Sequence, residues 1–112
     1  MIKCYLEDKT LLVQFTTTEL DHHVATYIKE NVDDIIMRKN IKNIIFDFQN
    51  IKFMDSSGIG VLLNRYKEMK ASRGSVCYCR ASRRVRRLME LSGICRLMEG
   101  YESREQAVGA LK

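Results

Sequence analysis

The spacing of apolar residues in the first third of the chain predicts two strands followed by a helix. Residues 2–7 and 10–16 are both β-prone, and the polar turn at residues 7–10 would join them as a hairpin. Apolar residues then recur along one helical face as far as about Arg38: Val24, Ile28, Val32 and Ile35 or Ile36. Asp21 precedes this stretch and is expected to cap the helix.

A second unit of strand, loop and helix occupies the middle of the chain. Residues 43–48 form a short apolar run bounded by polar residues, which predicts a buried strand. The polar loop 53–60 leads from it into a helix at about 57–71, where apolar residues again share one face: Ile59, Leu62, Leu63, Tyr66 and Met69. Gly74 breaks the chain before residues 75–79, which are another β-prone segment.

The last third is expected to contain two helices separated by a short strand. Ser82 can cap a helix that closes near Gly93, and a strand is expected at residues 96–98. Ser103 and Gln106 have the spacing of a capping box at the start of the last helix. This order of elements predicts an α/β fold with a mixed sheet and with helices mainly on one side of it.

Length and composition restrict the class of protein. The chain has 112 residues, of which 46% are hydrophobic and 29% charged, and it contains no proline. These values predict one soluble globular domain over residues 1–112. Acidic residues occur as early as Glu7 and Asp8, and no apolar run approaches the roughly 20 residues of a membrane-spanning helix. We therefore expect a cytoplasmic protein.

The four cysteines bear on redox state and on metal binding. They include no CxxC pair, and two of them, Cys77 and Cys79, would face the same side of a strand. The adjacent His22 and His23 lack the spacing that puts two imidazoles on one helical face. We expect reduced, partly buried thiols, with no bound metal and no structural disulfide.

The net charge of +5 is concentrated in the second half of the chain. One segment holds five arginines within eight residues: Arg80, Arg83, Arg84, Arg86 and Arg87. Such a cluster could bind phosphates of a nucleic acid, but no aromatic residues for base stacking are interleaved with it. Val85, Leu88 and Met89 also mark the segment as a helix that faces a core. A solvated helix face or a protein-docking patch is the better interpretation, and no direct binding of nucleic acid is expected.

The loop 53–60 carries the candidate chemistry. Just before a helix it places an acid, two hydroxyls and two glycines: Asp55, Ser56, Ser57, Gly58 and Gly60. Because the first N–H groups of a helix lack partners there and the helix dipole is positive, a serine could cap the helix, and a phosphate on that serine would be stabilised. The loop matches neither GxxxxGK[ST] nor GxSxG, so a nucleotide cradle or a hydrolase elbow is unsupported. From the residues alone, an ordinary helix cap and a phosphorylation switch both stay open.

Five segments together resemble the anti-sigma factor antagonists of the STAS domain family, most closely those that act on a sporulation sigma factor. The segments are 19–23 (ELDHH), 53–61 (FMDSSGIGV), 65–67 (RYK), 85–88 (VRRL) and 91–93 (LSG). The resemblance covers nearly the whole chain. It implies a STAS-type α/β fold with a mixed sheet of four or five strands and about four helices mainly on one side.

The resemblance also implies a partner switch rather than catalysis by this chain. In such a switch the unphosphorylated antagonist binds an anti-sigma factor that is also a serine kinase, so the sigma factor is released. The kinase then uses ATP to phosphorylate the antagonist, which dissociates, and a PP2C-type phosphatase resets the switch. No cofactor and no membrane partner are expected, and the free chain is expected to be a monomer. Two alternatives remain: a STAS switch for a general stress or other sigma factor, and an enzyme that uses Asp55 and Ser57, for which the chain shows no base, oxyanion pattern or metal set.

Carried onto this chain, the motif assigns Ser57 as the phosphoacceptor, because it directly precedes the motif glycine Gly58. Asp55 matches the motif acid, and Asp21 matches the acid at the start of the first helix. The two glycines lack Cβ atoms, which would let a kinase approach the backbone closely. The expected partner-binding residues are therefore Asp21, Asp55, Ser56, Ser57, Gly58 and Gly60.

One position departs from the family pattern. Thr18 stands where family members commonly have glycine. A β-branched residue does not readily take the positive φ that glycine permits, so the turn into the first helix is expected to differ and the presentation of Asp21 stays open.

Overall fold

A mixed five-stranded sheet organises the chain, and its strands lie in the order β1-β2-β4-β6-β7. The structure is a computed structural model and describes residues 1–111. The strands are β1 (Ile2–Glu7), β2 (Thr10–Phe15), β4 (Asn43–Asp47), β6 (Ser75–Cys79) and β7 (Glu99–Tyr101). β1 and β2 form the predicted antiparallel hairpin, and β2, β4, β6 and β7 run parallel to one another. The prediction of a mixed sheet is therefore confirmed.

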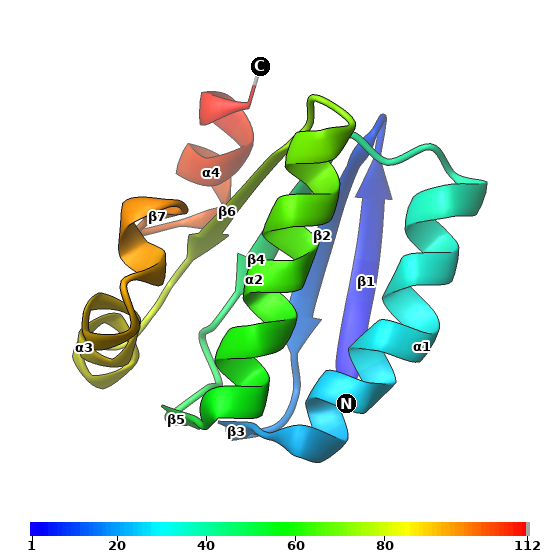
Figure 1. Ribbon diagram of the computed structural model, residues 1–112. Helices are drawn as coiled ribbons and strands as arrows, with labels where there is room; N and C mark the ends of the chain where they lie inside the picture. Colours follow the sequence, from blue (N-terminus) through cyan, green and yellow to red (C-terminus); the bar gives the residue numbers. More distant parts are fainter. Residues whose placement is uncertain (112) are drawn as a thin grey trace.

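Three of the four helices cover one face of this sheet (Figure 1). They are α1 (His22–Arg38), α2 (Ser56–Ala71) and α3 (Arg83–Ser92), and they bury the main core. The fourth, α4 (Arg104–Ala110), lies on the other face, where Ala107 packs against Leu12, Ile45 and both Cys77 and Cys79. Because side chains alternate along a strand, each inner strand supplies both cores. Helices mainly on one side, and two cysteines on the same face, are as predicted.

The segment after α3 differs from the prediction. The expected strand at residues 96–98 is wrong: a 3₁₀ turn spans Ile94–Arg96, and β7 begins only at Glu99. Ile94 and Met98 are both buried in the main core. Two apolar residues four positions apart share one face of a helical turn and also one face of a strand, so this spacing could not distinguish the two.

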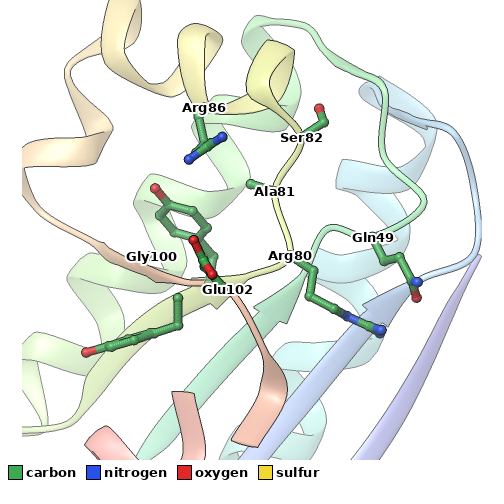
Figure 2. A pocket seen from close by; sticks show the side chains of 9 residues that line it. Gln49, Arg80, Ala81, Ser82, Arg86, Gly100 and Glu102 are labelled. Carbon is green, nitrogen blue, oxygen red and sulfur yellow. The ribbon is translucent and has the colours of Figure 1, made fainter. Parts of the chain in front are cut away.

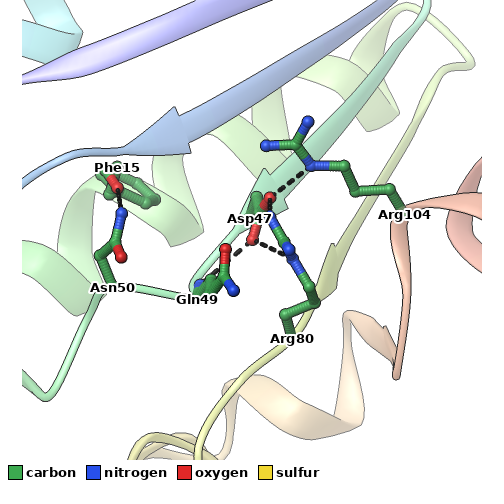
Figure 3. A network of polar contacts seen from close by, with 6 residues as sticks. All are labelled: Phe15, Asp47, Gln49, Asn50, Arg80 and Arg104. Carbon is green, nitrogen blue, oxygen red and sulfur yellow. Dashed lines mark hydrogen bonds and ion pairs between the residues drawn. The ribbon is translucent and has the colours of Figure 1, made fainter.

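A buried carboxylate joins three separate elements (Figure 3). Asp47, at the end of β4, is 0% exposed, and its side chain accepts hydrogen bonds from the guanidinium groups of Arg80 and Arg104. The Arg104 Nε lies 2.6 Å from Asp47 Oδ2, and the backbone N–H of Gln49 donates to Oδ1 at 3.1 Å. Burial alone would raise the pKa of Asp47, but these donors outweigh it and hold the pKa below its ordinary value. Since Arg104 is the first residue of α4, the cluster ties that helix to the sheet.

We expect Asp47→Asn to lower the free energy of unfolding by about 2 kcal/mol at neutral pH, because both arginines lose a charged partner while remaining partly hydrated. Their side chains are 28% and 30% exposed, which keeps the loss below that of a fully buried pair. A group with a depressed folded pKa stabilises the fold above its unfolded pKa, about 3.9, and that contribution disappears as the pH falls through the folded value. The difference between variant and wild type should therefore shrink below about pH 4.

Urea denaturation at several pH values measures this difference. The matched control is Asp34→Asn, since Asp34 pairs with Arg38 on the exposed surface of α1 at 2.8 Å, with side chains 57% and 70% exposed. This control should change stability by less than about 0.5 kcal/mol. Equal effects of the two substitutions would contradict a structural role for the Asp47 cluster.

Candidate phosphorylation and partner-binding site

A short ribbon of two strands brings the starts of α1 and α2 together. β3 (Glu19–Leu20) and β5 (Phe53–Met54) pair in parallel, with Leu20 opposite Met54. Each strand leads directly into a helix, α1 after β3 and α2 after β5, and both helices start at the same end of the molecule (Figure 1). This two-residue ribbon was not predicted, because two residues show no periodicity. It is what places Asp21 and Asp55 at neighbouring helix starts.

Aspartates, not serines, cap these two helices. One carboxylate oxygen of Asp21 accepts from the backbone N–H groups of His23 at 3.0 Å and Val24 at 3.1 Å. Asp55 Oδ1 accepts from the N–H of Gly58 at 2.9 Å. The prediction that Asp21 caps the first helix is confirmed, whereas the suggestion that a serine caps the second is wrong. Since Asp55 has the cap position, the serine hydroxyls are not needed to hold the helix.

Ser56 and Ser57 occupy the first two positions of α2. Ser56 is exposed and Ser57 is half-buried, and neither hydroxyl makes a hydrogen bond to any residue in 1–111 that the structure describes. The backbone N–H groups at these positions have no carbonyl one turn earlier to bond, and the helix dipole is positive there. A phosphate on either hydroxyl would therefore lie beside unpaired N–H donors.

The two glycines of the loop have different surroundings. A Cβ atom added at Gly58 would lie 2.2 Å from the carbonyl oxygen of Leu20 and 2.8 Å from its Cγ, whereas one at Gly60 would have no atom of residues 1–111 within 4 Å outside its own helix turn. Gly58 is therefore required by the close approach of α2 to β3. Gly60 has no such internal reason, so close approach of a partner remains a hypothesis for this residue alone.

Thr18 enters the ribbon without a strained backbone. It is not among the residues with positive φ, and its carbonyl accepts from the N–H of Lys52 at 2.7 Å and of Phe53 at 3.4 Å. The family glycine is thus replaced by a threonine in ordinary geometry, and Asp21 still caps α1. Thr18 therefore does not prevent Asp21 from capping α1.

The arginine-rich helix α3 contacts the start of the loop 53–60, which carries Ser56 and Ser57. The guanidinium of Arg84 lies over the ring of Phe53, 5.5 Å from its centroid, and this ring is 37% exposed just before Asp55. The contact is a cation–π interaction between α3 and β5. Sequence reasoning missed it, because nothing in the order of residues places position 84 beside position 53. It gives the loop a basic and aromatic border next to its acidic caps.

One surface pocket lies away from Ser56 and Ser57. It has a volume of about 550 Å³ and lies where β6 and β7 end and α3 begins, with Gln49, Arg80, Ser82, Arg86 and Glu102 among its lining residues (Figure 2). Its walls combine both charges and face open solvent. Arg80 in this wall donates a hydrogen bond to the buried Asp47, so its side chain has a structural role.

The thiols and the other metal-binding side chains are dispersed. Burial raises the pKa of Cys77 to about 12 and that of Cys79 to about 11, which makes both poor nucleophiles. Within residues 1–111, no three His, Cys, Asp or Glu side chains gather in a way that could hold a metal ion. In the same range, every helix is too short or too polar to cross a membrane.

Comparisons with known proteins agree with this geometry. Residues 5–107 match the STAS domain family. The anti-sigma F factor antagonist of Paenibacillus polymyxa is 33% identical over 102 residues, which are 91% of this chain and 87% of that protein. The anti-sigma factor antagonist SpoIIAA in its unphosphorylated form superposes with a TM-score of 0.85 at 28% identity, covering 96% of this chain and 93% of that one. The Bacillus cell fate determinant SpoIIAA in the phosphorylated form gives 0.79 at 26% identity, covering 100% of both chains.

Proposed function

Because the chain belongs to the STAS domain family, we propose that it is an anti-sigma factor antagonist controlled by phosphorylation of Ser57. In its unphosphorylated form it binds an anti-sigma factor that is also a serine kinase, so that a sporulation sigma factor is released. The kinase transfers the γ-phosphoryl group of ATP to Ser57 Oγ, which loses its proton, and ADP leaves. A PP2C-type phosphatase later hydrolyses the phosphoester. The chain is a binding partner and a substrate in this cycle rather than an enzyme, and it acts in the cytoplasm.

The position of Ser57 carries this proposal. Its hydroxyl has no hydrogen bond to another described residue, it is only half-buried, and it lies two residues after the Asp55 cap. A kinase could therefore phosphorylate this hydroxyl without disrupting a hydrogen bond that stabilises the fold. Asp21, Asp55, Ser56 and Gly60 would form the docking surface around it, and the buried Gly58 would hold α2 close to β3 beneath that surface.

Electrostatics can account for the release of the partner. Phosphorylation adds about −1.5 to −2 charges beside two aspartate caps. The free N–H groups at the start of α2 stabilise that charge locally, so the fold should persist. The phosphorylated and unphosphorylated SpoIIAA structures both superpose on this chain, which supports a switch without large rearrangement. At the interface, the same charge and its bulk repel a surface fitted to Asp21 and Asp55, and every loss of about 1.4 kcal/mol weakens binding tenfold.

We expect Ser57→Asp to weaken binding to the anti-sigma factor kinase at least about tenfold, because it adds a negative charge where the phosphate would lie. The free energy of unfolding should stay within about 0.5 kcal/mol of wild type, since the Ser57 hydroxyl makes no hydrogen bond to any described residue. Calorimetric titration measures the affinity, and urea denaturation measures the stability.

Ser56→Asp is the matched control, since it adds the same charge one residue away on the exposed side of the helix start. It should weaken binding less than Ser57→Asp. A wild-type chain that neither binds the kinase nor displaces its sigma factor would overturn the proposal. If a stress sigma factor is displaced and a sporulation sigma factor is not, the chain controls a stress pathway by the same phosphorylation mechanism.

A further inference from the structure

Strand β1 forms an open edge of the sheet. It is the first strand in the order β1-β2-β4-β6-β7, and five of its six residues are exposed. Tyr5 and Leu6 are each 48% exposed. The opposite edge, β7, has only three residues. A six-residue edge of this kind presents a row of unpaired backbone groups to any strand that can align with it.

The hairpin decides which backbone groups face outward. Met1 accepts from the N–H of Thr16 at 2.9 Å, and Glu7 lies opposite Thr10 at the turn. Odd-numbered residues of β1 therefore direct their N–H and C=O groups to β2. The groups that face the free edge belong to Ile2, Cys4 and Leu6, because they alternate with the others.

A second copy of β1 can pair with this edge in a self-complementary register. With a two-fold axis at Tyr5, antiparallel pairing places Lys3 opposite Glu7 of the second copy, and Glu7 opposite its Lys3. Tyr5 then meets Tyr5, and Cys4 meets Leu6. Neither Lys3 nor Glu7 has an ion-pair partner within residues 1–111, so both charges are available. Pairing about Cys4 instead would oppose Lys3 to Tyr5 and leave the charges unmatched.

A groove beside the strand fits the same register. Between β1 and α1 lies a hollow of about 350 Å³ whose lining combines apolar and charged side chains: Ile2, Cys4, Tyr27, Glu30, Asn31, Asp34, Ile35 and Arg38. Cys4 and Leu6 point to the α1 side of the sheet, because they lie opposite Val13 and Leu11 of the main core. Leu6 of the second copy, placed opposite Cys4, would therefore enter this hollow.

We propose that the unphosphorylated chain associates into a symmetric dimer through antiparallel β1–β1 pairing centred on Tyr5. This differs from the monomer expected from the sequence, which contained no sign that β1 would be an open edge. The dimer is weak and concentration-dependent, because each copy contributes only one six-residue strand to the contact. It does not use the helix starts that carry the serine loop, so two phosphorylation sites stay accessible.

Charge reversal and charge swap test the dimer and its register together. Sedimentation velocity from about 10 μM to about 1 mM should show a sedimentation coefficient that rises with concentration for the wild type. Lys3→Glu creates two like-charge contacts and should weaken the dimer about tenfold. The double variant Lys3→Glu, Glu7→Lys should restore the dimer to within about twofold of wild type. A coefficient that stays constant up to the highest concentration overturns the dimer, and a double variant no better than the single one overturns the register.

Disulfide capture gives an independent readout. Leu6→Cys places a new thiol opposite Cys4 of the second copy, at a hydrogen-bonded pair whose Cα separation of about 5.5 Å suits a disulfide. Mild oxidation should yield a covalent dimer from Leu6→Cys and none from the control Cys4→Ser, Leu6→Cys. Covalent dimer from the wild type through Cys4 alone would overturn the proposed register in favour of pairing about Cys4.

Discussion

We expect Ser57→Ala to abolish phosphorylation of this chain by the proposed anti-sigma factor kinase, whereas Ser56→Ala should leave that phosphorylation in place. This is the largest effect we expect, because removal of the accepting oxygen leaves no group to take the phosphoryl. Ser56 precedes Ser57 by one residue and differs from it in orientation on the helix and in exposure. Intact mass after incubation with kinase and ATP measures the result, as a phosphate gained or not gained.

The controls separate loss of the acceptor from loss of the fold or of binding. Ser57→Ala should keep wild-type stability within about 0.5 kcal/mol, because the Asp55 carboxylate and not the serine caps α2. It should also bind the kinase persistently in the presence of ATP, since the release step is blocked. Phosphorylation of Ser57→Ala to the wild-type extent would refute the assignment. Loss of phosphate from Ser56→Ala alone would move the acceptor to Ser56.

The elements of this fold that could be predicted are those in which the spacing of apolar residues repeats several times. The long helical face from Val24 to Val32 repeats often enough to predict α1, and the hairpin of β1 and β2 is visible as two β-prone runs around a polar turn. The segment after Gly93 was misplaced, because two apolar residues four apart suit a turn as well as a strand. The β3–β5 ribbon could not be predicted, since its pairing joins positions more than 30 residues apart by two residues each.

The sequence motif proposes Asp21, Asp55 and Ser57 as site residues, and this assignment stays a prediction. Their spatial relation could not be predicted, because it depends on the β3–β5 ribbon that aligns the two helix starts. Asp55 rather than a serine caps α2, and this distinction requires helix boundaries that sequence patterns give only within a few residues. The Arg84–Phe53 contact depends on how α3 packs and has no local signal.

Gly58→Ala should lower the free energy of unfolding by about 3 kcal/mol, because the new methyl would overlap a backbone atom that cannot move alone. Its Cβ would lie 2.2 Å from the Leu20 carbonyl oxygen, which itself accepts the N–H of Asp55 at 3.3 Å. Relief of the clash must separate α2 from β3, and this would disturb the ribbon and the Asp55 cap together. Urea denaturation measures the loss, and kinase binding should weaken in parallel because Asp21 and Asp55 no longer hold their relative positions.

Gly60→Ala is the matched control on the same helix and should have the opposite sign. Because Gly60 is helical and its added Cβ would meet none of the described neighbouring residues within 4 Å, the substitution should leave stability unchanged or raise it by up to about 1 kcal/mol. Equal stability of the two variants would contradict the close approach of α2 to β3. The same pair separates two reasons for glycine in this loop: if Gly60→Ala is fully stable yet is phosphorylated more slowly, Gly60 serves the approach of the kinase, whereas Gly58 serves the fold on which that approach depends.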